Sequence, residues 1–256
     1  MHDLSSKRAL VIGATSGIGF AVTANLVSSG AQVMAAGRRA EAANKLEEMG
    51  ARFVRCDITD EESVVNCLSE ASAQLGGIDI LVINAGVADD EESLSAYASE
   101  AMNVAIDTNL KGAFYALKHA ATVLADGASV IYTGSVVGSG LTHAGAGVYA
   151  AGKAGGAYLA RTAAIENAER GIRVNTVCPA LIADTGMMVA DDGNDTAQFL
   201  SQLNAFGRMG RLDEVVGIYN FLASDAASFI TGQEIRVDGG MTAGFGNPLM
   251  GGLAGG

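Results

Sequence analysis

The amino-acid sequence predicts an α/β fold with a doubly wound sheet of about seven parallel strands and helices on both faces. Short runs rich in Val and Ile alternate along the chain with longer segments of helical periodicity, an order in which helices connect parallel strands. Most of the short runs are apolar throughout rather than at alternate positions. That pattern is typical of strands buried on both faces.

Strands and helices are expected to alternate along nearly the whole chain. Strands are predicted at residues 9–12, 32–35, 52–56, 80–83, 129–132, 172–177 and 234–237. Helices are predicted at residues 18–29, 40–49, 61–75, 98–124, 149–170 and 213–223. Gly30, Gly50 and Gly171 lie between a helix and the next strand, where a left-handed residue ends the helix. The sequence TDEE, from Thr59 to Glu62, predicts a capping box at the third helix.

The composition indicates one globular domain spanning residues 1–256. Hydrophobic residues make up 49% of the chain and charged residues 17%, far from the charge-rich profile of disorder. The net charge of −12 and the scatter of the 16 Lys and Arg residues exclude nucleic acid as a general partner. The N-terminus lacks a signal-peptide pattern, and no apolar stretch has membrane-spanning length. We therefore expect a cytoplasmic protein with no membrane partner.

The cysteine and histidine content predicts no metal site. Cys56, Cys67 and Cys178 lie far apart and form no CxxC pair, and the chain has only 3 histidines. Isolated cysteines of this kind are commonly small core residues. All three are therefore expected to be buried free thiols.

A glycine-rich turn follows the first predicted strand. In the sequence GATSGIG, Gly13, Gly17 and Gly19 stand between that strand and the first helix. Glycines there permit a tight turn and a close approach of the backbone to a pyrophosphate, which the helix N-terminus stabilises. Such a turn also occurs in purely structural loops, but its position between the first strand and helix favours a dinucleotide site.

The spacing GxxxGxG resembles the glycine motif of the short-chain dehydrogenase/reductase family. Four further matches follow in the family's order: INAG at residues 83–86, Asn109 in NLKG, Ser135 after the fifth strand, and YAAGK at residues 149–153. The ending FITGQEIRVDGG is also similar, so the resemblance covers about residues 5–242. It implies a single-domain Rossmann-type fold. It also implies a reversible hydride transfer between NAD(P)(H) and a secondary alcohol or ketone.

The resemblance implies catalytic roles for Asn109, Ser135, Tyr149 and Lys153. A tyrosine with an ordinary pKa near ~10 is a poor base, but a lysine ammonium four residues on shares its helix face and favours the phenolate. Tyr149 then becomes a usable general acid/base, while Lys153 also holds the nicotinamide ribose. Ser135 is expected to orient the substrate oxygen. Asn109 is expected to disrupt its helix and hold a water that links Lys153 to solvent.

The end of the second strand sets the choice of nucleotide. The sequence MAAGRR places Gly37 where NAD-preferring relatives carry Asp, followed by Arg38 and Arg39. The missing carboxylate removes repulsion from a 2′-phosphate, and a guanidinium can bind that phosphate bidentately. NADP(H) is therefore favoured. NAD(H) is the alternative if both arginines are solvated surface charges.

Further cofactor contacts follow from the resemblance. Asp57 is expected at the adenine amino group, with helix capping near Thr59 as the alternative. The segment PALIADT, residues 179–185, is expected to hold the nicotinamide carboxamide through Ile182 and Thr185. The complete expected set is Gly13, Thr15, Ser16, Gly17, Ile18, Gly19, Gly37, Arg38, Arg39, Asp57, Ile58, Asn84, Ala85, Gly86, Tyr149, Lys153, Pro179, Ala180, Ile182 and Thr185.

The substrate is expected to meet mostly apolar side chains. The candidate lining residues are Val136, Val137, His143, Met187, Met188, Phe199, Leu200 and Leu203, of which His143 is alternatively an ordinary loop residue. Several come from the irregular segment 181–210, interpreted as a substrate-binding loop or lid, or simply a long loop. This segment has no Lys or Arg before Arg208. A neutral, fairly hydrophobic secondary alcohol or ketone is therefore favoured.

Two other functions are compatible with parts of the pattern. A 3-oxoacyl-carrier-protein reductase would use the same motifs but needs a basic patch for its acidic carrier, and no clear patch is visible in so acidic a chain. Some relatives keep the fold as a non-catalytic cofactor sensor or scaffold. The intact set of Asn109, Ser135, Tyr149 and Lys153 argues against that class.

The resemblance also implies a homotetramer. The small residues of AAGKAGGAYLA, residues 150–160, are expected to let helices of two subunits approach closely. The glycine-rich tail at residues 244–256 is expected either to reach across an interface or to be disordered.

Overall fold

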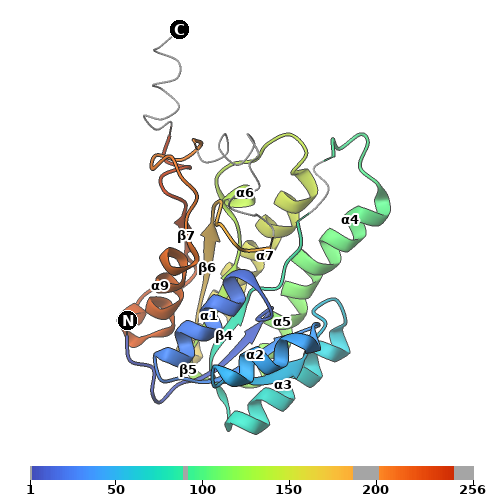
Figure 1. Cartoon of the computed structure of the whole chain (residues 1–256). Helices are drawn as coiled ribbons and strands as arrows, with labels where there is room; N and C mark the ends of the chain where they lie inside the picture. The colour runs from blue at the N-terminus through green and yellow to red at the C-terminus, as the bar shows by residue number, and fades with distance from the viewer. Residues whose placement is uncertain (1, 89–91, 187–201, 245–256) are drawn as a thin grey trace.

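The structure, a computed structural model, describes residues 2–88, 92–186 and 202–244 and contains a sheet of seven parallel strands with helices on both faces (Figure 1). The strands are β1 Arg8–Ile12, β2 Gln32–Gly37, β3 Arg52–Arg55, β4 Ile78–Ile83, β5 Leu124–Thr133, β6 Arg173–Pro179 and β7 Glu234–Val237. The α-helices are α1 Gly17–Ser28, α2 Ala43–Glu48, α3 Glu61–Leu75, α4 Ser99–Ile106, α5 Gly112–Ala120, α6 Val136–Ser139, α7 Gly147–Glu166 and α9 Leu212–Ala223. Shorter turns are η1 Ala40–Ala42, η2 Asp107–Lys111, η3 Ala168–Arg170 and η4 Asp225–Ala227. The predicted fold class is confirmed.

Alternate residues of each strand bury their side chains in opposite helical layers. Leu10 and Ile12 of β1 pack in one core with α3, α5 and α7, whereas Ala9 and Val11 pack in a second core with α1 and α9. Figure 1 shows α1 and α9 side by side over one face of the sheet. Because both faces are covered, the strands are apolar at consecutive positions, as the sequence predicts.

The strand order β3-β2-β1-β4-β5-β6-β7 places the point where the order reverses between β1 and β4. The chain leaves β1 toward one edge of the sheet and leaves β4 toward the other. In sheets of this type the connections diverge at that point and leave a crevice at the carboxyl ends of the strands. The candidate site lies in this crevice.

The predicted helix at residues 98–124 is interrupted. The π-helical turn η2 separates α4 from α5, and the helical region ends at Ala120, before β5 begins at Leu124. Within η2, the Asn109 side chain binds the main chain of Val87. The helical pattern of the sequence continues across residues 107–111, where the structure has the π-helical turn. The pattern cannot show the contact of Asn109 with Val87, because the two residues are distant in the chain.

Helix ends follow the glycine pattern but not the predicted capping box. Gly30, Gly50 and Gly171 have φ of 91°, 96° and 67°, so the left-handed ends are confirmed. The prediction of a TDEE capping box is wrong, because the N-cap of α3 is Asp60, whose carboxylate accepts from the backbone N–H of Glu62 at 3.1 Å. A carboxylate in an N-cap already satisfies an unpaired amide without a reciprocal partner.

Contacts within the chain require glycine at two positions of α7. The sequence had suggested contact with a neighbouring subunit as the reason for these small residues. A Cβ added at Gly152 would lie 2.9 Å from Cβ of Asn109, and one at Gly156 would lie 2.3 Å from the hydroxyl of Tyr132. Both distances are shorter than side chains tolerate. These glycines let α7 lie directly against η2 and β5.

Gly156→Ala is expected to destabilise the protein although alanine is the better helix former. The added methyl group would collide with the buried ring of Tyr132, and overpacking of that kind costs roughly 1–3 kcal/mol, against a helix-propensity gain of about 1 kcal/mol. The matched control is Gly217→Ala on α9, an exposed position with no atom within 4 Å of the added Cβ. Urea unfolding should show loss of stability in the first variant and a gain in the second. A Gly156→Ala protein at least as stable as wild type would contradict this packing.

Candidate active site

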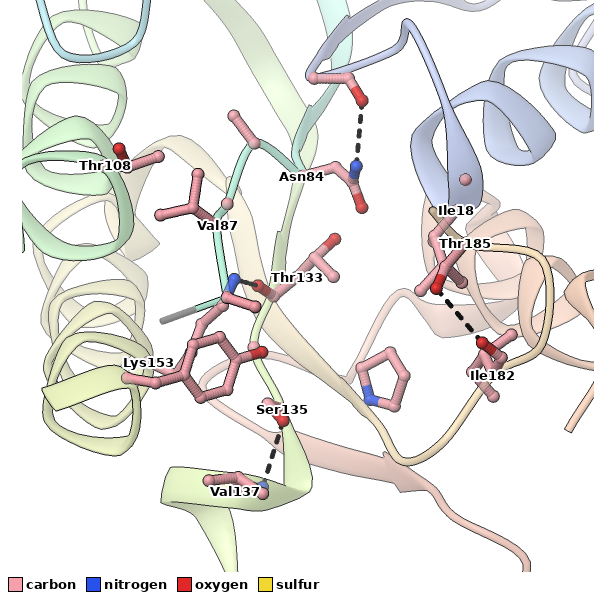
Figure 2. Close-up of a pocket in the computed structure, with 18 of the residues that line it drawn as sticks. Ile18, Asn84, Val87, Thr108, Thr133, Ser135, Val137, Lys153, Ile182 and Thr185 are labelled. Carbon is pink, nitrogen blue, oxygen red and sulfur yellow. Dashed lines mark hydrogen bonds between the residues drawn. The ribbon is translucent and has the colours of Figure 1, made fainter. Parts of the chain in front are cut away.

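A cavity of about 580 Å³ opens at the carboxyl ends of the strands. Its walls come from the glycine-rich turn, the end of β2, the residues after β4, the end of β5, α7 and the segment after β6. Figure 2 shows Lys153, Thr133 and Ser135 on one wall, with Ile182 and Thr185 on the other. This size falls within the range of cofactor and small-molecule sites.

The glycine-rich turn holds β1, α1 and the residues after β4 in close contact. Gly13 has φ of 88°, and a Cβ there would lie 2.4 Å from the backbone nitrogen of Ala85. The side chain of Asn84 donates a hydrogen bond to the carbonyl of Gly13 at 3.0 Å, as Figure 2 shows. Predicted residues Asn84, Ala85 and Gly86 all line the cavity beside this turn.

The N-terminus of α1 is suited to an anion. Its N-cap residue Ser16 makes no side-chain cap, and the first turn contains no acidic residue. The first backbone N–H groups of a helix have no partner within it and carry the positive end of the helix dipole. Ser16, Gly17 and Ile18 line the cavity, so these residues fit the pyrophosphate of a dinucleotide.

The end of β2 adds positive charge beside the same turn. Gly37, Arg38 and Arg39 line the cavity. The guanidinium of Arg39 donates to the hydroxyl of Thr15 at 3.0 Å and to that of Ser16 at 2.5 Å. This places a cation at the rim, next to the predicted phosphate position. A Cβ at residue 37 would lie 2.6 Å from the methyl group of Thr15, so a larger side chain would have to displace it.

Asp57 is held by its own turn. Its carboxylate accepts hydrogen bonds from the backbone N–H and the hydroxyl of Thr59 at 3.0 and 2.8 Å. Burial opposes ionisation, but these hydrogen bonds and the charges of Arg38 and Arg55 lower the pKa of Asp57 overall. Ile58 lines the cavity, whereas Asp57 is not among the lining residues. Asp57 therefore acts on the turn after β3 in this structure, and Asp60 caps the helix.

Lys153 lies at the centre of the candidate site. It is only 3% exposed, and its ammonium donates to the main-chain carbonyl of Thr133 at 2.9 Å. The nitrogen is 5.9 Å from the ring centroid of Tyr149 and 5.5 Å from that of Tyr132. Burial lowers the pKa of Lys153 to about 8. Tyr149 and Lys153 both line the cavity, one helical turn apart on α7.

Ser135 lies two residues after the end of β5 and is the N-cap residue of α6. Its Oγ accepts a hydrogen bond from the backbone N–H of Val137 at 3.1 Å. That bond uses the oxygen as acceptor and leaves the hydroxyl hydrogen for a group in the cavity, which Ser135 lines. Ser135 thus serves both as the N-cap of α6 and as a polar group facing the cavity.

Asn109 lies behind the cavity wall. Its amide pairs with the backbone of Val87 in both directions, at 3.0 and 2.9 Å, and Val87 lines the cavity. The close packing extends to Gly86, where a Cβ would lie 2.8 Å from the Lys153 nitrogen and 3.1 Å from the Asn109 Oδ1 atom. Asn109, Gly86 and Lys153 therefore form one tightly packed group.

The segment after β6 closes the opposite side of the cavity. Pro179 at the end of β6 lines it together with Ala180, Ile182 and Thr185, and the Thr185 hydroxyl donates to the carbonyl of Ile182 at 3.2 Å (Figure 2). Gly19 lies in the turn but is not a lining residue. The expected substrate residues Val136, Val137, His143 and Leu203 line the cavity. Met187, Met188, Phe199 and Leu200 lie outside the described residues, as does most of the tail at residues 244–256.

Several lining residues were not predicted from the sequence, among them Thr59, Val87, Ala88, Thr108, Thr133, Leu141, Ala146 and Met241. Thr133 acts through its main-chain carbonyl, which no side-chain pattern reveals. Met241 lies four residues after the end of β7 and lines the cavity, a position that no local sequence pattern indicates. The sequence indicates where the strands end. It does not indicate which of the following loops come together around the cavity.

The fold and the cavity together define the class of protein: an oxidoreductase that uses a nicotinamide dinucleotide. A family model described as enoyl-(acyl carrier protein) reductase matches residues 13–242. The chain belongs to the short-chain dehydrogenase/reductase family. It is an NAD(P)(H)-dependent enzyme that interconverts alcohol and carbonyl groups.

Curated relatives match nearly the whole chain. Cis-4-hydroxycyclohexanecarboxylate dehydrogenase of Sinomonas cyclohexanicum is 39% identical over 247 residues, covering 93% of this chain and 98% of the relative. The 3-oxoacyl-acyl-carrier-protein reductase FabG of Salmonella typhimurium is 38% identical over 244 residues, with the same coverage of 93% and 98%. Among solved structures, a short-chain dehydrogenase/reductase of Serratia marcescens aligns with a TM-score of 0.88 and 31% identity, covering 94% of this chain and all of that one.

The buried ammonium predicts a specific dependence of stability on pH. The pKa of Lys153 is about 8 in the folded protein, below its unfolded value near ~10.4, so unfolding takes up a proton between these values. Stability should therefore rise as pH increases through this window. Relative to Lys153→Met, the wild type should gain up to about 3 kcal/mol in free energy of unfolding between pH ~7 and ~10.4.

Denaturant titrations without nucleotide measure this difference, and the same change at the exposed Lys45 is the control. A constant difference between wild type and Lys153→Met across the pH range would show that the Lys153 pKa is not depressed.

Proposed function

We propose that the enzyme catalyses reversible NADP(H)-linked oxidation of a neutral secondary alcohol, with Tyr149 as general acid/base. The observation that carries this proposal is the buried Lys153 ammonium, 5.9 Å from the Tyr149 ring, in the same cavity as the glycine-rich turn. A cation in that position favours the phenolate over the phenol. Tyr149 can then exchange a proton with a hydroxyl group near neutral pH.

Each proposed residue has a separate task. The backbone N–H groups at the start of α1 would hold the pyrophosphate, and Lys153 would hold the nicotinamide ribose. When bound, the nicotinamide accepts or donates the hydride. Ser135 donates its hydroxyl hydrogen to the substrate oxygen and orients it toward Tyr149. Asn109 keeps the main chain at Val87 in place beside Lys153, and the water-mediated link to solvent remains part of the proposal for this residue.

Tyr149→Phe is expected to bind nucleotide normally and to lose turnover by about 10²–10⁴-fold, because it removes the proton-transfer group and little volume. Steady-state kinetics and a fluorescence titration with NADPH measure the two effects. Tyr158→Phe on the same helix is the control, because that side chain is 66% exposed and outside the cavity. Near-normal kcat in Tyr149→Phe would refute the assigned role.

The rim of the cavity supports NADP(H) over NAD(H). Arg38 and Arg39 lie at the end of β2, and Arg39 already contacts Thr15 and Ser16 beside the helix N-terminus. No carboxylate occupies position 37 to bind a ribose diol or repel a phosphate. A 2′-phosphate would meet these guanidinium groups.

Arg38→Ala and Arg39→Ala are each expected to lower kcat/KM for NADP about 10- to 100-fold and to leave kcat/KM for NAD nearly unchanged, since only NADP carries the phosphate. Parallel kinetics with both nucleotides measure this. Arg55→Ala is the control, because Arg55 lies on β3 and does not line the cavity. Equal use of NADP by wild type and both variants would leave NAD(H) as the better assignment.

The substrate end of the cavity supports a neutral, apolar compound. Its described lining includes Val137, Leu141, Ala146, Leu203 and Met241. Apart from the proposed catalytic pair Tyr149 and Lys153, His143 is the ionisable side chain among the described lining residues there, since Arg38 and Arg39 lie at the nucleotide end. A buried carboxylate without a cationic partner is costly.

A second candidate, 3-oxoacyl-carrier-protein reductase, is favoured by the similarity to FabG. An acidic carrier needs unpaired basic side chains near the cavity. Arg208 is instead paired with Glu214 at 2.6 Å, and Arg211 with Asp213 at 3.0 Å. These pairs leave less positive charge for a carrier protein.

A substrate panel distinguishes the candidates. Cyclohexanol-type alcohols are expected to give kcat/KM at least about tenfold above their carboxylate analogues, because the latter bring an unpaired charge into an apolar site. A 3-oxoacyl carrier protein forms the third arm of the panel. A carboxylate preference that is lost in His143→Leu, or a preference for the carrier-linked substrate, would overturn the neutral-substrate proposal.

A homotetramer and a cytoplasmic location complete the proposal. Phe114 on α5 and both Tyr158 and Ile165 on α7 are exposed apolar side chains, and Phe229 is fully exposed. Surfaces of this kind support contacts between subunits. Cys56, Cys67 and Cys178 are all buried and free, as is usual in reducing compartments. Among the described helices, none has both the length and the apolar character to cross a bilayer. Light scattering tests the assembly, and a monomer would contradict it.

A further inference from the structure

Tyr132 is a buried aromatic residue that none of the roles above uses. It lies on β5, next to Thr133, whose carbonyl accepts the hydrogen bond of Lys153. It is 1% exposed and packs in the core shared with α5 and α7. Its neighbour Thr133 points to the opposite layer, where its hydroxyl is 2.8 Å from that of Tyr219.

Two contacts connect Tyr132 to the candidate site. Its ring centroid is 5.5 Å from the Lys153 nitrogen, within the range of a cation–π interaction. Its hydroxyl donates to the main-chain carbonyl of Asn109 in the π-helical turn at 3.2 Å. Gly156, one turn after Lys153, leaves the space that the Tyr132 hydroxyl occupies.

We propose that Tyr132 is a positioning residue for the reaction, whose ring face stabilises the Lys153 ammonium and whose hydroxyl fixes the π-helical turn at Asn109. This inference rests on the roles proposed above for Lys153 and Asn109. It adds one side chain that acts on both through separate atoms.

The chemistry of the surroundings explains why such a residue is needed. The ammonium is buried, and within the described part of the chain its hydrogen bond goes to a neutral carbonyl, which compensates its charge poorly. The negative face of an aromatic ring supplies part of that compensation without a competing carboxylate. The other titratable groups that act on Lys153 or Tyr132 are Tyr149 on α7 and Cys178 on β6. Burial raises the pKa of Tyr132, which keeps its hydroxyl protonated and able to donate to Asn109.

The contribution of the Tyr132 ring to stabilising the Lys153 ammonium is tested by changing the charge distribution of the ring while keeping its shape. Tyr132→Phe keeps the ring, and Tyr132→trifluorophenylalanine keeps the shape but weakens the negative face. The measured quantity is the pKa of Lys153 in the nucleotide-free protein, from NMR of labelled lysine assigned with Lys153→Met. The fluorinated variant is expected to have a Lys153 pKa lower than that of Tyr132→Phe by about half a unit or more. Equal pKa values in these two proteins would overturn the ring's role.

The hydroxyl contribution is read from amide hydrogen exchange in residues 107–111. Tyr132→Phe is expected to speed exchange there relative to wild type, while exchange in α1, which packs in the core on the other side of the sheet, serves as the control. Unchanged exchange in residues 107–111 would overturn the hydroxyl's role. Both readouts are independent of turnover. Failure of the proposed function would appear instead as normal kcat in Tyr149→Phe.

Discussion

The candidate site depends on an ammonium group that is buried at the carboxyl end of β5 and that pairs with no carboxylate among the residues the structure describes. Lys153 meets the Thr133 carbonyl and the rings of Tyr132 and Tyr149. A carboxylate partner would neutralise the charge and cancel the effect proposed for it on Tyr149. The surrounding fold therefore has to keep a poorly compensated cation in place through packing.

That packing comes from elements that are distant in the sequence. The glycines of α7 allow it to lie against β5 and the π-helical turn, and Gly86 leaves room for the ammonium beside Asn109. Asn109 in turn holds the main chain of Val87. The interruption between α4 and α5 is thus part of the support of the site. A regular helix through residues 98–124 would displace the amide that binds Val87.

The sequence was sufficient for features that are local or periodic. The strands, the glycine-rich turn and the spacing of Tyr149 and Lys153 on one helix face all follow from short-range patterns, and the family confirms the reaction class. The sequence was insufficient to predict contacts that depend on how distant elements are placed relative to one another. No pattern in the residues around Thr133 indicates that its main-chain carbonyl accepts a hydrogen bond from the Lys153 ammonium. Around Asp57 the sequence left two roles open, adenine binding and a local role near Thr59, and the bonds from Thr59 to its carboxylate appear only in the structure.

The two ends of the cavity differ in charge although the whole chain carries −12. The nucleotide end has Arg38, Arg39 and the start of α1, whereas the described substrate end is mostly apolar. An anionic cofactor must therefore be attracted by local groups against the overall charge of the protein. This arrangement also keeps the cations away from Lys153, whose pKa would otherwise fall further.

If Lys153 makes Tyr149 a usable base, the titration of the Tyr149 phenol has to depend on Lys153. Ultraviolet difference spectroscopy of wild type against Tyr149→Phe isolates the phenolate signal of this residue as a function of pH. The Tyr149 phenol is expected to have a pKa below the ordinary value near ~10 in wild type and a higher one when Lys153 is replaced by methionine. The same phenol pKa with and without Lys153 would contradict it.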